Sequence, residues 1–279
     1  MNITIKKKPF RRKYIITTVL IPLLIIAVLI FILRTQEQKP DPASEAVIRA
    51  EVAAQLNKDP NELTDEDFTL FTEFEFDMFR SPVQLPKIVT INGKKRSVWL
   101  ELTDIKIFEK FTNLQSLHLN NIAYPDRNIP KWMKFATKFG FIDLADRFSI
   151  DLNPLKKLHS LHTLTFGQVP VKNIKPLSSL TNLETLCLDS TEVCDLGPIK
   201  NLTKLKFLHV GHTEISDLEA IKGLTNLEKL IITGTKISDL EPVKSLPNLQ
   251  RLWLEMCDNI TDEQVEDLQK ALPNLKITR

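Results

Sequence analysis

The second half of this chain repeats with a fixed period of 22 residues. Each unit opens on a leucine and places apolar residues at the same later phases; the opening residues are Leu158, Leu180, Leu202, Leu224 and Leu246. A period of this length marks one supersecondary unit that buries its apolar face only against copies of itself. The chain is therefore expected to fold as a solenoid, in which each repeat completes the core of its neighbour.

An L-x-L segment in each unit predicts a short strand, because side chains alternate between the two faces of a strand. Leu186 and Leu188 are expected to point inward, with Cys187 between them pointing outward. Successive strands would pair in parallel into one curved sheet, and the next segment would form an irregular or short-helical convex wall. One position of that segment recurs in every unit, and its side chain can form hydrogen bonds with buried backbone groups. This position is occupied by Thr191, Thr213, Thr235 and Cys257.

Three consecutive units share the consensus L-x-x-L-x-L-x-x-T-x-[IV]-x-[DN]-[LI]. They read LTNLETLCLDSTEVCDLGPIKN, LTKLKFLHVGHTEISDLEAIKG and LTNLEKLIITGTKISDLEPVKS. This consensus resembles the 22-residue leucine-rich repeat of bacterial internalin-like proteins, and the resemblance covers residues 98–279. It implies an α/β leucine-rich-repeat solenoid with a curved parallel sheet, a helical N-terminal cap and a role in binding.

Two further units extend the repeat pattern toward the N-terminus, and Leu100 and Leu102 are taken to start the stack. One is a longer unit from Phe111 with Leu114, Leu117 and Leu119, and the other is a weaker unit that starts at Ala136 and carries Ile142 and Leu144. The second unit would add a strand just before the unit of Leu158.

The N-terminus carries the pattern of a membrane anchor. Tyr14 to Leu33 is a run of apolar-dominated residues without a charge, and about 20 residues of helix span roughly 30 Å of hydrocarbon. No small-residue cleavage site follows, so an uncleaved transmembrane helix is favoured over a signal peptide. Pro22 is compatible with this, since membrane helices tolerate proline.

The charge distribution predicts the orientation of this helix. Six basic residues and no acidic ones precede it, which places the N-terminus in the cytoplasm and the repeats outside. The chain has 37 Lys and Arg against 35 Asp and Glu, so the part beyond the tail is weakly acidic. A nucleic-acid partner is therefore not expected, because it would require a basic face on the folded domain.

The expected organisation has six parts. They are a basic cytoplasmic tail (1–13), a transmembrane helix (14–33), a tether (34–44), an N-terminal cap with a hairpin (45–97), the leucine-rich repeats (98–257) and a C-terminal cap (258–279).

Capping signals predict helices in both caps. Asp41-Pro42 precedes an apolar stripe formed by Ile48, Val52 and Leu56. Thr64 precedes a second apolar run, which contains Phe68, Leu70 and Phe71. Asn92-Gly93 predicts a hairpin within residues 87–102, for which the sequence suggests no purpose. At the far end, Thr261 predicts an amphipathic helix that covers the last repeat.

The outward residues of the strands would form the concave face, the surface left free for contact. The candidate ligand-binding residues on it are Phe207, His209, Lys229, Arg251 and Trp253. Tryptophan and arginine are frequent anchors of binding hot spots, and the fold requires no aromatic residue here. Exposed aromatic residues can also be accidental, so the sequence leaves both interpretations open.

The strongest catalytic hypothesis is a thiol enzyme using Cys187 and His209, which would be neighbours about 4.8 Å apart on adjacent strands. The sequence offers this pair no orienting partner or oxyanion site, so it remains a remote alternative. The three cysteines are expected to be unpaired thiols. No metal site or cofactor motif is predicted, since His159 and His162 fall at surface phases.

These observations favour a non-enzymatic, single-pass membrane protein that displays its repeats outside the cytoplasm, in the periplasm or at the cell exterior. It would bind a protein or an envelope component through the concave sheet, with no small-molecule substrate. A self-associating structural scaffold of the envelope is the alternative.

Overall fold

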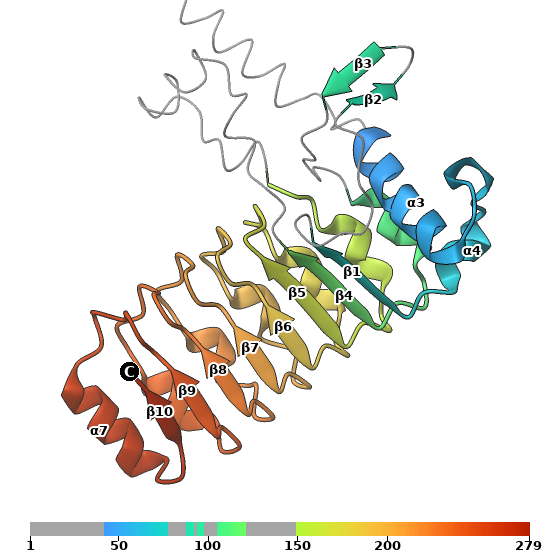
Figure 1. Ribbon diagram of the computed structural model, residues 1–279. Helices are drawn as coiled ribbons and strands as arrows, with labels where there is room; N and C mark the ends of the chain where they lie inside the picture. Colours follow the sequence, from blue (N-terminus) through green and yellow to red (C-terminus); the bar gives the residue numbers. More distant parts are fainter. Residues whose placement is uncertain (1–41, 78–87, 92–93, 98–104, 121–148) are drawn as a thin grey trace, which may run out of the picture. The chain divides into compact units, whose positions relative to one another are not determined.

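The computed structural model describes residues 42–77, 88–91, 94–97, 105–120 and 149–279 (Figure 1). The chain divides into two compact units, Met1–Pro40 and Asp41–Arg279, and every element below lies in the second. The predicted tail, transmembrane helix and most of the tether fall outside the described residues. None of the helices in the described ranges is long and apolar enough to cross a bilayer, so the span at residues 14–33 stays a prediction.

The described repeats form one parallel sheet of eight strands in the order β1-β4-β5-β6-β7-β8-β9-β10 (Figure 1). The register places Leu186 beside Leu208 and Leu208 beside Leu230, and all three are fully buried. The predicted inward stack is thereby confirmed. The strands are β1 (Glu73–Asp77), β4 (Ser116–Asn120), β5 (Thr163–Gly167), β6 (Thr185–Cys187), β7 (Phe207–His209), β8 (Lys229–Ile231), β9 (Arg251–Trp253) and β10 (Lys276–Thr278).

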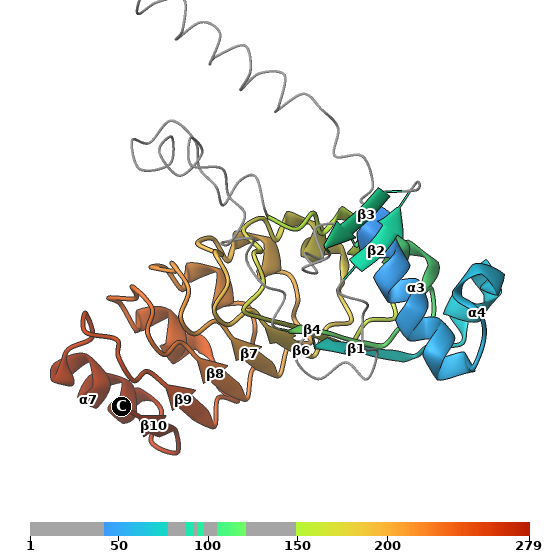
Figure 2. The same ribbon diagram turned by 45° about the horizontal axis from the view of Figure 1, so that its top comes forward.

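Short 3-10 helices form the opposite wall (Figures 1 and 2). They are η3 (Lys106–Lys110), η4 (Asn153–Lys157), η5 (Lys175–Ser179), η6 (Gly197–Ile199), η7 (Glu219–Ile221) and η8 (Glu241–Ser245). Four of them begin with proline in the first turn, where no amide donor is needed; these are Pro154, Pro176, Pro198 and Pro242. The wall contributes a second line of buried aliphatic residues, such as Leu177 and Ile199.

The predicted threonines do satisfy buried carbonyl groups, but within their own repeats. Thr213 donates to the Val210 carbonyl at 2.6 Å and Thr235 to that of Ile232 at 2.7 Å. Side-chain hydrogen bonds join neighbouring repeats in addition to the backbone bonds of the sheet. In a row of asparagines that was not predicted, Asn182, Asn226 and Asn248 each donate to a carbonyl 23 residues earlier, at 2.8–2.9 Å. The repeats are thus joined by polar contacts as well as by their core.

The N-terminal cap contains α3 (Pro42–Leu56), η2 (Pro60–Glu62) and α4 (Asp65–Thr69). Both predicted helices are present, although Leu70 is 67% exposed and does not join the core as expected. The cap is closed by phenylalanine rings packed edge to face or tilted, with centroids 5.1–6.2 Å apart. This cluster covers the first repeat, and its members are Phe68, Phe71, Phe74, Phe108 and Phe111.

A separate two-stranded sheet confirms the predicted hairpin. β2 (Ile88–Ile91) pairs antiparallel with β3 (Lys94–Ser97), and Ile91 lies opposite Lys94. The turn residues themselves, and the ends of the predicted range 87–102, lie outside the described residues.

The sheet extends beyond the predicted repeat range at both ends. β1, at residues 73–77, pairs with β4, so it holds the place expected for a strand around Leu100 and Leu102. At the other end, α7 (Asp262–Ala271) is the predicted capping helix, and the chain then returns as β10 beside β9. The final turn of the chain therefore adds a strand that the sequence analysis missed.

The unit expected from Ala136 does not add a strand where it was placed. β4 pairs directly with β5, with Ser116 opposite Thr163 and Leu117 opposite Leu164. Residues 121–148 lie outside the described part of the chain. The apolar match to the repeat consensus at Ala136 was therefore misleading, because β4 and β5 are direct neighbours in the sheet although 42 residues separate them in the sequence.

One position of each repeat adopts a left-handed backbone conformation. Its φ is 54° at Gln168, Ser190 and His212, 58° at Met256 and 65° at Gly234. Only Gly234 is a glycine, and it also allows a close approach, since a Cβ there would lie 2.6 Å from Nδ1 of His212.

We predict that Gly234→Ala lowers the free energy of unfolding by about 1–2 kcal/mol, the cost of placing a Cβ in a left-handed conformation. Urea titration measures the change. Gly223→Ala is the control, because its Cβ would make an ordinary 3.6 Å contact with the Lys200 carbonyl oxygen. Equal stability of the two variants would contradict the prediction.

Candidate functional site

Three neighbouring strands display the five predicted binding residues on one face. β7 carries Phe207 and His209, and their intervening leucine is buried while both ends are partly exposed. β8 and β9 repeat this alternation with Lys229 and with Arg251 and Trp253. The side chains face outward because the aliphatic residue between them is held in the core.

The strand register arranges these residues in two rows that run across the sheet. The first row places Phe207 beside Lys229 and Lys229 beside Arg251. The second row runs from His209 through Ile231 to Trp253. The structure therefore brings all five predicted residues together on the concave face.

His209 is held by its surroundings on this face. Its ring centroid lies 6.4 Å from that of Phe207, and its Nδ1 is 3.8 Å from Oδ1 of Asp189. Gly211 leaves room for the ring, since a Cβ there would lie 3.0 Å from Nε2. Burial lowers the pKa of His209 and nearby His212 adds to this, while Asp189 acts in the opposite direction. His209 is therefore a neutral imidazole at pH 7, able to donate and to accept a hydrogen bond.

The environment of Cys187 opposes a catalytic role. Burial, with the nearby charge of Asp189, raises the pKa of this thiol to about 12, and a hydrogen bond with Thr165 offsets only part of the effect. The thiolate is the nucleophilic form of cysteine, so the Cys187 and His209 pair lacks the activation that a thiol enzyme needs. The three cysteines are free, with Cys194 exposed and Cys257 buried.

Three residues of this face were missed as candidates. Ile231 lies between His209 and Trp253, and β10 places Lys276 beside Arg251 and Thr278 beside Trp253. The sequence contained a signal for β10, because the string Leu-Pro-Asn-Leu at 246–249 recurs at 272–275.

A third outward row borders the apolar row and is partly acidic. Glu255 follows Trp253 along the chain and accepts a hydrogen bond from the Thr233 hydroxyl at 2.8 Å. Asp189 occupies the equivalent phase three repeats earlier. On β8 and β9, the concave face thus carries the basic Lys229 and Arg251 in the first row, the apolar Ile231 and Trp253 in the second, and the acidic Glu255 in the third.

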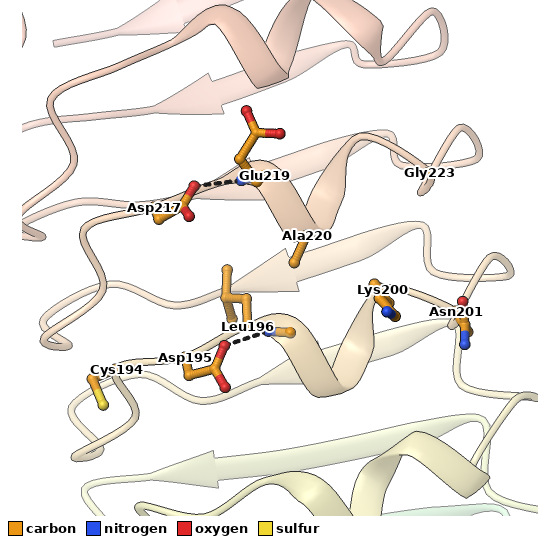
Figure 3. A pocket seen from close by; sticks show the side chains of 10 residues that line it. Cys194, Asp195, Leu196, Lys200, Asn201, Asp217, Glu219, Ala220 and Gly223 are labelled. Carbon is orange, nitrogen blue, oxygen red and sulfur yellow. Dashed lines mark hydrogen bonds between the residues drawn. The ribbon is translucent and has the colours of Figure 1, made fainter.

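An open hollow of about 510 Å³ lies on the opposite wall, between the 3-10 helices η6 and η7 (Figure 3). Its carboxylates already have partners: Asp195 accepts from the Gly197 amide and Asp217 from the Glu219 amide, both at 2.7 Å, and the Glu219 carboxylate pairs with Lys222. The two bonds from amides cap the two short helices, so the hollow is explained by the fold. The described residues contain no group of three side chains suited to hold a metal ion.

Comparison with known proteins agrees with the repeat assignment. The family model "Leucine Rich repeats (2 copies)" matches residues 203–245 and 225–270. Internalin C2 of Listeria monocytogenes is similar in structure, with a TM-score of 0.52 and 21% identity over 85% of this chain and 92% of that chain. No curated protein matches the sequence.

Two further solved structures are more distant. A leucine-rich repeat protein of Leptospira interrogans has a TM-score of 0.48 and 20% identity, over 63% of this chain and 46% of that chain. An internalin (inlF) of Listeria monocytogenes has a TM-score of 0.41 and 21% identity, over 87% of this chain and 92% of that chain. Residues 203–270 are thus leucine-rich repeats, and the chain shares the fold of internalin C2, as the resemblance predicted.

We predict that iodoacetamide at pH 7.5 modifies Cys194 on the order of a hundredfold faster than Cys187, because the raised pKa leaves Cys187 almost entirely as the thiol. Peptide mass spectrometry of the native protein measures both rates, and Cys187→Ser is the control for assignment. Equal or faster modification of Cys187 would revive the thiol-enzyme hypothesis.

Proposed function

We propose that this protein is a membrane-anchored, extracytoplasmic receptor-like module that binds a protein or envelope component through its concave sheet. One observation carries the proposal. Phe207 and Trp253 stand partly exposed on the same face, while the leucine between the outward residues of each strand is fully buried. Solenoids generally use such extended surfaces for binding and have no catalytic role there.

The partly exposed aromatic rings are the main source of binding energy in this proposal. Buried aromatic and arginine side chains supply most of the binding energy in typical interfaces, and Arg251 lies on the same strand as Trp253. His209 and Lys229 would serve as polar neighbours. The concave sheet is built on rigid strands, so little conformational entropy would be lost when a partner covers it.

The membrane anchor is the second part of the proposal. It is supported by the uncharged run at residues 14–33 and the six basic residues before it. An alkaline phosphatase fused after Arg279 is expected to be active in intact cells, and activity of a cytosol-dependent reporter at that position would contradict the orientation.

Fragment 41–279 contains every described element and its core, so it is suited to a capture experiment. We predict that it retains partners from an envelope extract and that the double variant Phe207→Ala, Trp253→Ala loses them, by about tenfold or more in affinity. Quantitative mass spectrometry of the captured proteins measures the difference.

A double variant on the opposite wall controls for non-specific effects. Lys156→Ala and Lys175→Ala replace exposed residues of η4 and η5 and should leave capture unchanged. Identical capture by all three proteins would refute the role of the concave aromatic residues. Assembly of the fragment that depends on its concentration, without other partners, would instead favour the self-associating scaffold.

A further inference from the structure

A row of three basic side chains crosses the C-terminal end of the concave face. The register places Lys229 beside Arg251 and Arg251 beside Lys276 on adjacent strands, and all three are exposed. Neighbouring strands are about 4.8 Å apart, so the row spans roughly 10 Å. Like charges directly opposite each other destabilise a sheet, which makes this alignment unfavourable in the free protein.

The row differs from three other lysines of the solenoid, which pair with carboxylates of an adjacent repeat. Lys206 pairs with Glu184 at 2.7 Å, and Lys236 and Lys244 pair with carboxylates of adjacent turns. Lys229, Arg251 and Lys276 make no ion pair with any residue in the described ranges. Ion pairs between adjacent repeats therefore form elsewhere in the solenoid, whereas the three basic side chains of this row have no carboxylate partner among the described residues.

The surroundings of the row limit what can occupy it. The partly exposed Ile231 and Trp253 lie beside it on the sheet, and Glu255 follows on the far side of that apolar row. A uniform polyanion laid across this surface would gain from the basic row and be repelled at Glu255. A segment with carboxylates along one edge and an apolar side chain along the other would match both rows.

We infer that the partner of the proposed binding face presents an acidic, amphipathic peptide segment, whose carboxylates contact Lys229, Arg251 and Lys276 and whose apolar side chain packs on Ile231 and Trp253. This inference rests on the proposed function, and it specifies the chemistry of the partner. The partner is a protein, because a peptide segment can present carboxylates beside an apolar side chain, whereas a uniform polyanion would be repelled at Glu255.

The test is selection of random 12-residue peptides displayed on phage, using the full chain in a non-ionic detergent. The selected peptides are expected to be rich in Asp and Glu and to carry at least one aliphatic or aromatic residue. Fluorescence anisotropy with synthetic copies should then show affinity that falls as salt is raised, since exposed charges are screened.

Two matched triple variants locate the contact. Lys229→Gln, Arg251→Gln, Lys276→Gln should weaken binding of the selected peptides about tenfold, from the loss of three exposed ion pairs. Lys156→Gln, Lys175→Gln, Lys200→Gln removes the same charge from exposed residues on the opposite wall and should change binding less than about twofold.

Three results would overturn the inference: selection of no peptide, selection of neutral or basic peptides, or equal binding by both triple variants. If neutral peptides are selected and the double variant Phe207→Ala, Trp253→Ala abolishes their binding, the proposed binding function holds. The inference that the partner is acidic is then wrong. Binding of inorganic polyphosphate as tightly as the acidic peptides would point instead to an anionic polymer, and would also overturn the inference.

Discussion

The whole structure depends on the stacking of aliphatic side chains between consecutive repeats. Leu186, Leu208, Leu230 and Leu252 occupy the same register position on four adjacent strands and are fully buried. Burying a leucine contributes about 1.5–3 kcal/mol, and no single repeat can obtain this alone. The ends of the stack therefore require covers, which are the phenylalanine cluster at the N-terminal end and α7 with β10 at the C-terminal end.

This dependence explains how much the sequence could predict. A period of 22 residues fixes which side chains face inward, so the strands, the convex wall and the rows of outward residues followed from it. The N-terminal strand β1 was missed because Phe74 and its neighbours lack the leucine consensus. The αL backbone at Ser190 and His212 was also not predicted, since it is set by stacking in the folded state and not by residue type.

The candidate site was predicted in part for the same reason. Outward positions on regular strands are determined by the period, and so Phe207, Lys229 and Trp253 could be placed together. Their chemistry depends on the surroundings, which the period does not reveal: the burial that raises the pKa of Cys187 was invisible in the sequence, as was the alignment of Lys276 with Arg251. In the structure, the outward residues of the last strands form a basic row and an apolar row beside it, and the acidic Glu255 lies beyond the apolar row.

The repeats form one continuous stack, which holds the concave face rigid. Amide hydrogen exchange of the full chain tests this most directly. If neighbouring repeats depend on one another, the inter-repeat amides of β6, β7 and β8 exchange together and only through large-scale unfolding. Rapid exchange of one of these strands while its neighbours stay protected would contradict the account.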